Sequence, residues 1–430
     1  MPSNLNTEQP TVPATSEARE VRGTAAPSLW VKSALLLLSL LFSAIVFLAL
    51  DWIRTATIER SARVQAGTAN CRVADPVRHH AYRPDCTFQD HWGKDWYDFS
   101  TNSLGFRDEK PRQVQPVETR PRILLLGDSF TEGQLAWRDS YAAMIAAHFP
   151  QYEFLNGGVG SYAPSNYFNV ARMLLAKGVD FDEVILFLDT GDAADEAAFY
   201  RDVDSSGAVA GPIQQRWKRS WYSASRYFIA KHLLLTNYLV EFLERQLVAH
   251  GFYHLTITLL GTNAFDVEGA AWPYRAVNES DPYPSGYAPL GVTGGIAKEK
   301  VKMNLLWQEL AARNIPLSVV VYPYPGQVVH DTVDSKQVRI WREWCEGKCK
   351  SFISLFPDFL ALKDQCPRSQ PGCWYLNDFI FGDFHYNAGG NALVAREIIK
   401  NLEEYPPAKI QSHVSGSTSL TSPAKPRPHV

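Results

Sequence analysis

The sequence predicts an α/β fold in which helices cover both faces of a parallel sheet. From Arg122 onward, short apolar runs alternate with helical stretches, and this alternation is typical of a sheet built from βαβ units. One uncharged apolar run near the N-terminus adds a predicted membrane helix. With 46% hydrophobic residues, the 430-residue chain can fill a sizeable core, which excludes a wholly disordered protein.

The charge balance excludes one class of function. Lys and Arg total 42 and Asp and Glu total 45, so the formal net charge is −3. No basic excess is present to neutralise a phosphate backbone. We therefore expect no nucleic-acid partner.

The N-terminal part predicts a tail followed by an anchor. Residues 1–29 are rich in Pro, Thr, Ser, Ala and Glu, a composition typical of disordered segments. Residues 33–50 carry no charge, and at about 1.5 Å per residue they span roughly 27 Å, close to the hydrocarbon thickness of a bilayer. We predict a retained single-pass helix over residues 30–53. A core helix and a cleaved signal peptide are the alternatives, but the first usually has a polar face and the second a shorter apolar run.

The cysteines indicate the compartment, which the charges flanking the apolar run do not decide. All six follow that run, and they fall into three local pairs: Cys71 with Cys86, Cys345 with Cys349, and Cys366 with Cys373. Such pairs predict disulfides and a periplasmic, extracytoplasmic body, because cytoplasmic thiols stay reduced. Zinc is the competing interpretation, since His79 and His80 lie inside the first pair, but no C-x-x-C spacing supports it.

The predicted elements follow one another over the body of the chain. Short, mostly apolar runs predict strands at residues 122–127, 152–155, 183–188 and 317–322. Between and after them, helices are predicted at residues 141–148, 167–177, 300–313 and 388–402. The C-terminal residues 406–430, rich in Ser, Pro and Thr, are predicted to form a second tail.

Residues 201–295 interrupt the alternation of predicted strands and helices, and we interpret them as an insertion beside or over the carboxyl edge of the sheet. It contains a predicted amphipathic helix at 225–248, whose apolar part is too short for a second membrane span. Four aromatic residues in it could stack on sugar rings or simply pack: Trp272, Tyr274, Tyr283 and Tyr287.

Two motifs carry the predicted chemistry. Ser129, in Gly127-Asp-Ser129, follows a buried strand and precedes a helix, and ligands collect at the carboxyl ends of parallel strands. A serine hydroxyl needs a base to act as a nucleophile. His385 can take its proton and Asp383 can orient the imidazole. Each motif alone is also common as an ordinary turn or capping pair.

Together the two motifs resemble the SGNH (GDSL-type) hydrolase superfamily over roughly residues 102–402. The lead-in Thr101-Asn-Ser-Leu-Gly-Phe-Arg107 is similar to that of membrane-anchored bacterial members, and the shortened Asp383-x-His385 to relatives of alginate-type O-acetyltransferases. The resemblance implies a flavodoxin-like three-layer αβα sandwich over residues 111–405, preceded by a juxtamembrane segment at 54–110. It also implies Ser129 as nucleophile.

The resemblance further implies an oxyanion hole, and here the sequence departs from the family. In Asn156-Gly-Gly-Val159, Gly158 is the expected donor beside the N–H of Ser129. The family's Gly-x-Asn-Asp block is Asp189-Thr-Gly-Asp192 in this chain, so Gly191 stands where the asparagine is expected. Its backbone N–H or a water could substitute, although the carboxylates beside it oppose an oxyanion. Losing one such donor costs about 2.7 to 4 kcal/mol of transition-state stabilisation.

These observations lead to three hypotheses. The first is an enzyme that hydrolyses an acyl ester or transfers an O-acetyl group, on an extracytoplasmic carbohydrate if the resemblance extends to substrate. The second is a catalytically degenerate, membrane-anchored binding or assembly component, with a multi-span acyltransferase as its partner. The third, motivated only by the anchor, is a lipase. No motif implies a metal or an organic cofactor.

Overall fold

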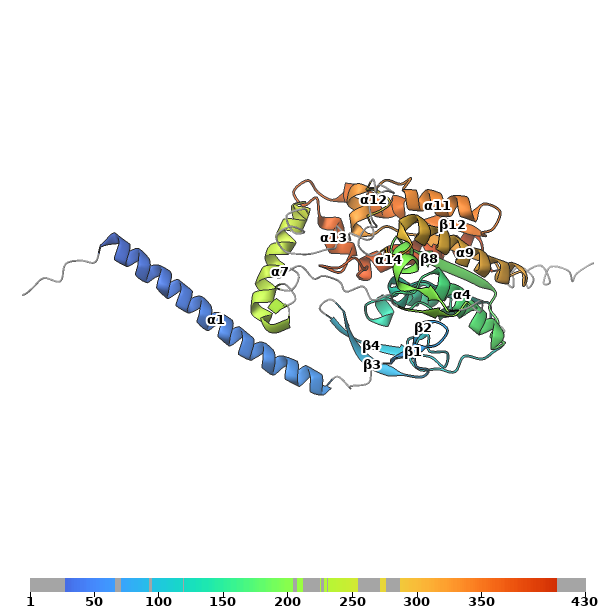
Figure 1. The fold of residues 1–430 in the computed structure, drawn as a ribbon, viewed down its shortest axis with the longest axis horizontal. Helices are drawn as coiled ribbons and strands as arrows, with labels where there is room; N and C mark the ends of the chain where they lie inside the picture. The colour runs from blue at the N-terminus through green and yellow to red at the C-terminus, as the bar shows by residue number, and fades with distance from the viewer. Residues whose placement is uncertain are drawn as a thin grey trace, which may run out of the picture.

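The computed structural model describes residues 28–65, 71–92, 95–118, 120–203, 207–211, 225, 228–229, 231–253, 271–275 and 287–407. The predicted tails at 1–29 and 406–430 lie almost entirely outside the described residues. Within them, the chain forms one long N-terminal helix and an α/β body (Figure 1).

The elements are as follows. The strands are β1 (Arg72–Asp75), β2 (His79–Tyr82), β3 (Thr87–Trp92), β4 (Asp95–Thr101), β5 (Arg107–Asp108), β6 (Arg122–Leu126), β7 (Glu153–Asn156), β8 (Glu183–Leu188), β9 (Arg201–Asp202), β10 (Val209–Ala210), β11 (Leu317–Val321) and β12 (Ser351–Ser354). The α-helices are α1 (Leu29–Gln65), α2 (Ser129–Glu132), α3 (Tyr141–His148), α4 (Pro164–Ala176), α5 (Asp192–Ala194), α7 (Leu234–Ala249), α9 (Gly291–Ala311), α10 (Pro325–His330), α11 (Lys336–Cys345), α12 (Phe356–Gln365), α13 (Cys373–Asp378) and α14 (Ala388–Glu404). A 3-10 turn (Trp137–Asp139) and a π-helical turn (Asp195–Phe199) complete them.

The body is organised around one eight-stranded sheet with the order β12-β11-β8-β6-β7-β5-β4-β3. The strands from β12 to β7 run parallel to one another. The strands β5, β4 and β3 are added antiparallel at the far edge. The prediction of a mixed α/β fold with a large, mostly parallel sheet is therefore confirmed.

The central strands are buried on both faces, as their apolar runs predict. Successive side chains of a strand point to opposite faces, so in β6 Leu124 and Leu126 join one core cluster while Ile123 and Leu125 join the other. Helices α4, α9 and α11 contribute to the first cluster and α3, α12 and α14 to the second. Burying one such side chain contributes about 1.5 to 3 kcal/mol, which explains why these strands lie at the centre.

Some elements differ from the sequence expectations. Helix α9 begins at Gly291 rather than near residue 300, so its first turns come from the predicted insertion. The predicted juxtamembrane segment contributes β3, β4 and β5 to the main sheet. In the hairpin of β3 and β4, Phe88 pairs with Phe99 and Asp90 with Tyr97 on one face. That face is turned inward, because Tyr97 and Phe99 are buried.

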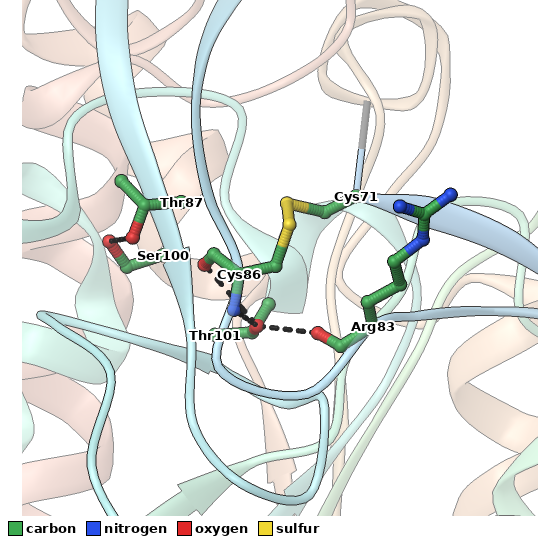
Figure 2. The surroundings of a disulfide bond; sticks show 6 residues. All are labelled: Cys71, Arg83, Cys86, Thr87, Ser100 and Thr101. Carbon is green, nitrogen blue, oxygen red and sulfur yellow. Dashed lines mark hydrogen bonds between the residues drawn. A yellow bond between two sulfur atoms is a disulfide. The ribbon is translucent and has the colours of Figure 1, made fainter. Parts of the chain in front are cut away.

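The three predicted disulfides are confirmed. The first, Cys71–Cys86, joins the chain that follows α1 to the start of the β3–β4 hairpin (Figure 2). Beside it, the Thr101 hydroxyl donates to Arg83 O at 2.7 Å and accepts from Cys86 N at 3.0 Å. Because both cysteines are in a disulfide, they are not zinc ligands.

Helix α1 contains the predicted anchor. Among the described residues, one helix is long and apolar enough to cross a membrane, and it is the part of α1 from Leu29 to Ile58. It projects from the body as the blue helix of Figure 1, and its side chains from residue 28 to residue 50 are exposed.

Candidate functional site

The turn after β6 presents Ser129 at the carboxyl edge of the sheet. The Asp128 carboxylate accepts a hydrogen bond from Phe130 N at 2.9 Å and so caps the short helix α2, which begins at Ser129. Gly127 makes the turn possible, because a Cβ there would lie 2.0 Å from Thr131 Oγ1. The tight turn leaves the Ser129 hydroxyl partly exposed beside the end of β6.

The structure brings three of the predicted site residues together. Ser129 Oγ lies 2.7 Å from His385 Nε2, and His385 Nδ1 lies 2.6 Å from Asp383 Oδ1. A carboxylate can only accept, so Nδ1 of the neutral imidazole carries the proton and Nε2 accepts from the serine hydroxyl. This is the arrangement in which a histidine can deprotonate a serine.

Asp383 is held as a carboxylate by several donors. Its Oδ1 also accepts from Phe384 N at 2.6 Å and from His385 N at 3.0 Å. Burial raises the pKa of Asp383, but the electrostatic interaction with His385 and these hydrogen bonds outweigh the effect of burial and hold the pKa below its usual range. The group therefore stays ionised at neutral pH and can orient the imidazole.

Trp92, which no sequence motif indicated, contacts both Asp383 and His385. Its indole N–H donates to Asp383 Oδ2 at 2.9 Å, and its ring meets the ring of His385 edge-on at 5.3 Å. Trp92 ends β3, so the contact joins residues 291 positions apart. Alternation along β3 places it on the inward face of the hairpin, but no sequence signal indicates which loop that face meets.

Tyr375 was also missed, and it organises the loop that carries Asp383. Its hydroxyl accepts from Gly382 N at 2.9 Å and from Asp383 N at 3.1 Å. The same oxygen lies 2.8 Å from Asp383 O and 3.1 Å from Ile380 O, to either of which it can donate. One buried hydroxyl thus contacts the backbone of three residues between α13 and α14: Ile380, Gly382 and Asp383.

The two glycines predicted for the oxyanion hole have N–H groups that are already hydrogen-bonded. Gly158 N donates to Asn156 Oδ1 at 3.0 Å, and Gly191 N donates to Asp189 Oδ1 at 2.6 Å. Gly160, in the loop after β7, lies close to Ser129, because a Cβ there would lie 3.6 Å from Ser129 Cβ.

Buried carboxyl groups lie behind Ser129. The Asp189 carboxylate accepts from Tyr324 OH at 2.7 Å, and Asp192 accepts from Tyr167 OH at 2.8 Å. Burial and then the charge of Asp189 raise the pKa of both Asp128 and Asp192 well above the usual range. Burial and the charge of Asp189 therefore disfavour the ionised form of both groups.

The predicted insertion covers the end of β8. Trp272 Nε1 donates to Thr190 O at 3.0 Å, and Trp272 and Tyr287 pack against Ala193 and Ala197. Both aromatic side chains are buried, so they form core rather than a sugar platform.

The other two aromatic residues of the predicted insertion are Tyr274 and Tyr283. Tyr274 stacks on His330, and Tyr283 lies outside the described residues.

In the part of the chain that the structure describes, no group of three or more His, Cys, Asp or Glu side chains is arranged to hold a metal ion.

Comparisons with known proteins add little to this geometry. No protein-family model and no curated protein matches the chain. Similar solved structures include a Lactobacillus plantarum protein (12% identity, TM-score 0.34, covering 67% of this chain and 99% of that one). They also include a gut microbial diltiazem-metabolizing enzyme (10%, 0.33, 67% and 48%) and a carbohydrate esterase (12%, 0.29, 69% and 68%). At TM-scores this low, none of them decides the fold or the function of this chain.

Proposed function

We propose that this chain is a serine-dependent esterase or O-acyltransferase of the SGNH type. The observation that carries the proposal is the pair of contacts from His385, 2.7 Å to Ser129 Oγ and 2.6 Å to Asp383 Oδ1. The strand order β7-β6-β8-β11-β12, which is 2-1-3-4-5 in chain order, supports it as well, because flavodoxin-like sheets have that order.

The reaction follows from these contacts. Ser129 Oγ attacks the carbonyl carbon of an acyl ester while His385 Nε2 takes the hydroxyl proton. The bond from that carbon to the leaving oxygen breaks, the released alcohol takes the proton from His385, and the acyl group stays on Ser129. An acceptor hydroxyl then attacks the acyl carbon, His385 takes its proton, and the proton returns to Ser129 as the acyl bond breaks. Water as acceptor gives hydrolysis, and a sugar hydroxyl gives transfer.

The substrate and location are part of the proposal. The resemblance to membrane-anchored SGNH proteins suggests an acylated carbohydrate, and the three disulfides suit an extracytoplasmic compartment. Helix α1 would then be a single-pass anchor.

Oxyanion stabilisation would start from the N–H of Ser129, at the N-terminus of α2. Gly158 and Gly191 could add donors only by giving up their present bonds to Asn156 and Asp189. This feature favours a second candidate, a membrane-anchored binding component that accompanies a multi-span acyltransferase and does little chemistry itself.

One experiment separates the two candidates. The full chain in detergent, with its disulfides formed, is given a small activated acetyl ester, and acetate release is compared with that of Ser129→Ala and His385→Ala. We expect both variants to lose on the order of 10³-fold or more in rate. His148→Ala is the matched control, because His148 is exposed and pairs with Glu403 away from the site.

The outcome that contradicts the proposal is equally specific. If the parent is as inert as both variants, and a serine-reactive phosphonate does not label Ser129, acyl transfer is excluded. The binding component then becomes the better account.

A further inference from the structure

Helix α7 has an exposed apolar side and buried acidic residues, the reverse of an ordinary surface helix. Its exposed side carries five apolar or aromatic residues with 37% to 57% of their surface accessible, which we call the apolar face: Leu235, Tyr238, Leu239, Phe242 and Leu243. Their spacing places them along one stripe of the helix. The opposite side, turned toward the body, contains Glu241 and Glu244, both buried. A water-exposed surface helix would have these two sides exchanged.

The N-terminus of α7 is fixed to α1. The Asp51 carboxylate accepts from Leu235 N and from Thr236 N, both at 2.8 Å, and the Thr55 hydroxyl accepts from Leu234 N at 2.8 Å. A carboxylate at a helix N-terminus satisfies N–H groups that have no partner within the helix. Asp51 and Thr55 are buried by this contact, although the preceding part of α1 is exposed.

The position of this contact matters, because Asp51 is the first charged residue after the apolar run 33–50. If that run fills the hydrocarbon layer, Asp51 lies at its boundary. Figure 1 shows that α7 runs across the direction of α1, not along it, with the body on one side of α7 and the apolar part of α1 on the other. A helix that starts at the boundary and runs across the span follows the membrane surface.

We propose that the apolar face of α7 binds lipid and lies in the boundary between headgroups and acyl chains of the bilayer that holds α1. Interfacial helices of this kind bury their apolar side to a shallow depth. Aromatic residues such as Tyr238 and Phe242 suit that depth, since aromatic side chains are favoured at membrane interfaces. The inference requires α1 to be embedded in a membrane but does not depend on the proposed catalytic activity.

Lipid binding by α7 would also position the candidate site. Near its C-terminal end, the Arg245 guanidinium lies 4.2 Å from the centre of the Phe381 ring, two residues before Asp383. Gly372, just before α13, approaches Val248 O so closely that a Cβ there would lie 1.8 Å away. The helix thus connects the predicted membrane surface directly to the loop that carries Asp383 and His385.

The test measures whether the apolar face meets lipid. Single cysteines are introduced as Leu239→Cys and Phe242→Cys and labelled with an environment-sensitive fluorophore without reductant, so that the disulfides stay intact. The matched control is Val301→Cys, because Val301 is 56% exposed on α9, on the other side of the body in Figure 1. Each full-length protein is reconstituted into vesicles of phosphatidylcholine and phosphatidylglycerol, with or without bromine on the acyl chains.

We expect probes at 239 and 242 to shift to shorter emission wavelengths in vesicles and to be quenched by brominated lipid. Bromines near the headgroups should quench more than bromines near the bilayer centre, and the probe at 301 should respond to neither. The proposal is overturned if the probes at 239 and 242 are quenched no more than the probe at 301. A protein partner in the native membrane would then be the better candidate to cover this face.

Discussion

Replacing Trp92 by phenylalanine removes one hydrogen bond from Asp383 and keeps an aromatic ring beside His385. The bond lost is the 2.9 Å contact from the indole N–H to Asp383 Oδ2. Hydrogen bonds to charged groups contribute about 1.5 to 3 kcal/mol. Because Trp92 is 38% exposed, a water molecule can replace part of the lost hydrogen bond to Asp383. We therefore expect the loss of transition-state stabilisation to be near the lower end of this range.

A cost of about 1.4 kcal/mol corresponds to roughly a tenfold loss in kcat/KM. The assay is acetate release from a small activated acetyl ester, measured as a function of pH. With one donor to the carboxylate removed, the pKa of Asp383 should rise, so the fall in activity that accompanies protonation of Asp383 should begin at a higher pH than in the parent. The matched control is Trp96→Phe, because Trp96 lies on the same hairpin, is 51% exposed and packs against His91 with the two rings tilted.

Two results would refute this reasoning. If Trp92→Phe keeps the parent rate and pH profile, the hydrogen bond does not support the site. If Trp96→Phe loses as much activity as Trp92→Phe, the effect comes from the hairpin as a whole.

Two further predictions concern stability. Tyr375→Phe removes the hydroxyl that fixes the loop before His385 and should lower the free energy of unfolding by about 1 to 3 kcal/mol, measured by chemical denaturation. The exposed Tyr405→Phe is the control, and an equal loss there would contradict the assignment. Burial and then the charge of Glu196 raise the pKa of Glu299 well above its ordinary value of 4.5. The folded state therefore disfavours ionisation of Glu299, so the free energy of unfolding falls as the pH rises above the pKa of Glu299 in the unfolded chain. We expect Glu299→Gln to have a higher Tm than the parent at pH 8 and a similar Tm at about pH 4. A gain of equal size at both pH values would contradict the titration.

The sequence predicts the centre of the fold well because local signals decide it. The helix predicted at 141–148 matches α3, whose N-terminus is capped by the Ser140 hydroxyl. The strand predicted at 183–188 matches β8, a run buried along its whole length. Strand β12 was not predicted, because its four half-buried residues have no apolar run. Its place depends on pairing with β11.

The candidate site was also predicted only in part: local motifs indicated some of its residues, and contacts that depend on the folded chain were not predicted. The motifs indicated Ser129 and His385, which lie 256 positions apart and come within hydrogen-bond distance. They could not indicate Trp92, because its contact with Asp383 joins residues 291 positions apart and depends on how the hairpin packs against the loop. Nor could they show that the N–H of Gly191 is taken by Asp189, since that bond depends on the conformation of the loop after β8.

The distance along the chain between Ser129 and His385 has a consequence for biosynthesis. A ribosome adds about 5 to 20 residues per second, so a span of 256 residues takes roughly 13 to 50 s to make. During that time Ser129 lacks the base proposed for it, and under the proposed mechanism the nascent chain cannot attack an ester. A chain that stops before residue 383 would keep helix α1 and Ser129 but would lack the proposed base and the carboxylate that orients it. Under the proposed mechanism, the reactivity of Ser129 therefore depends on a part of the chain that is made long after the serine itself.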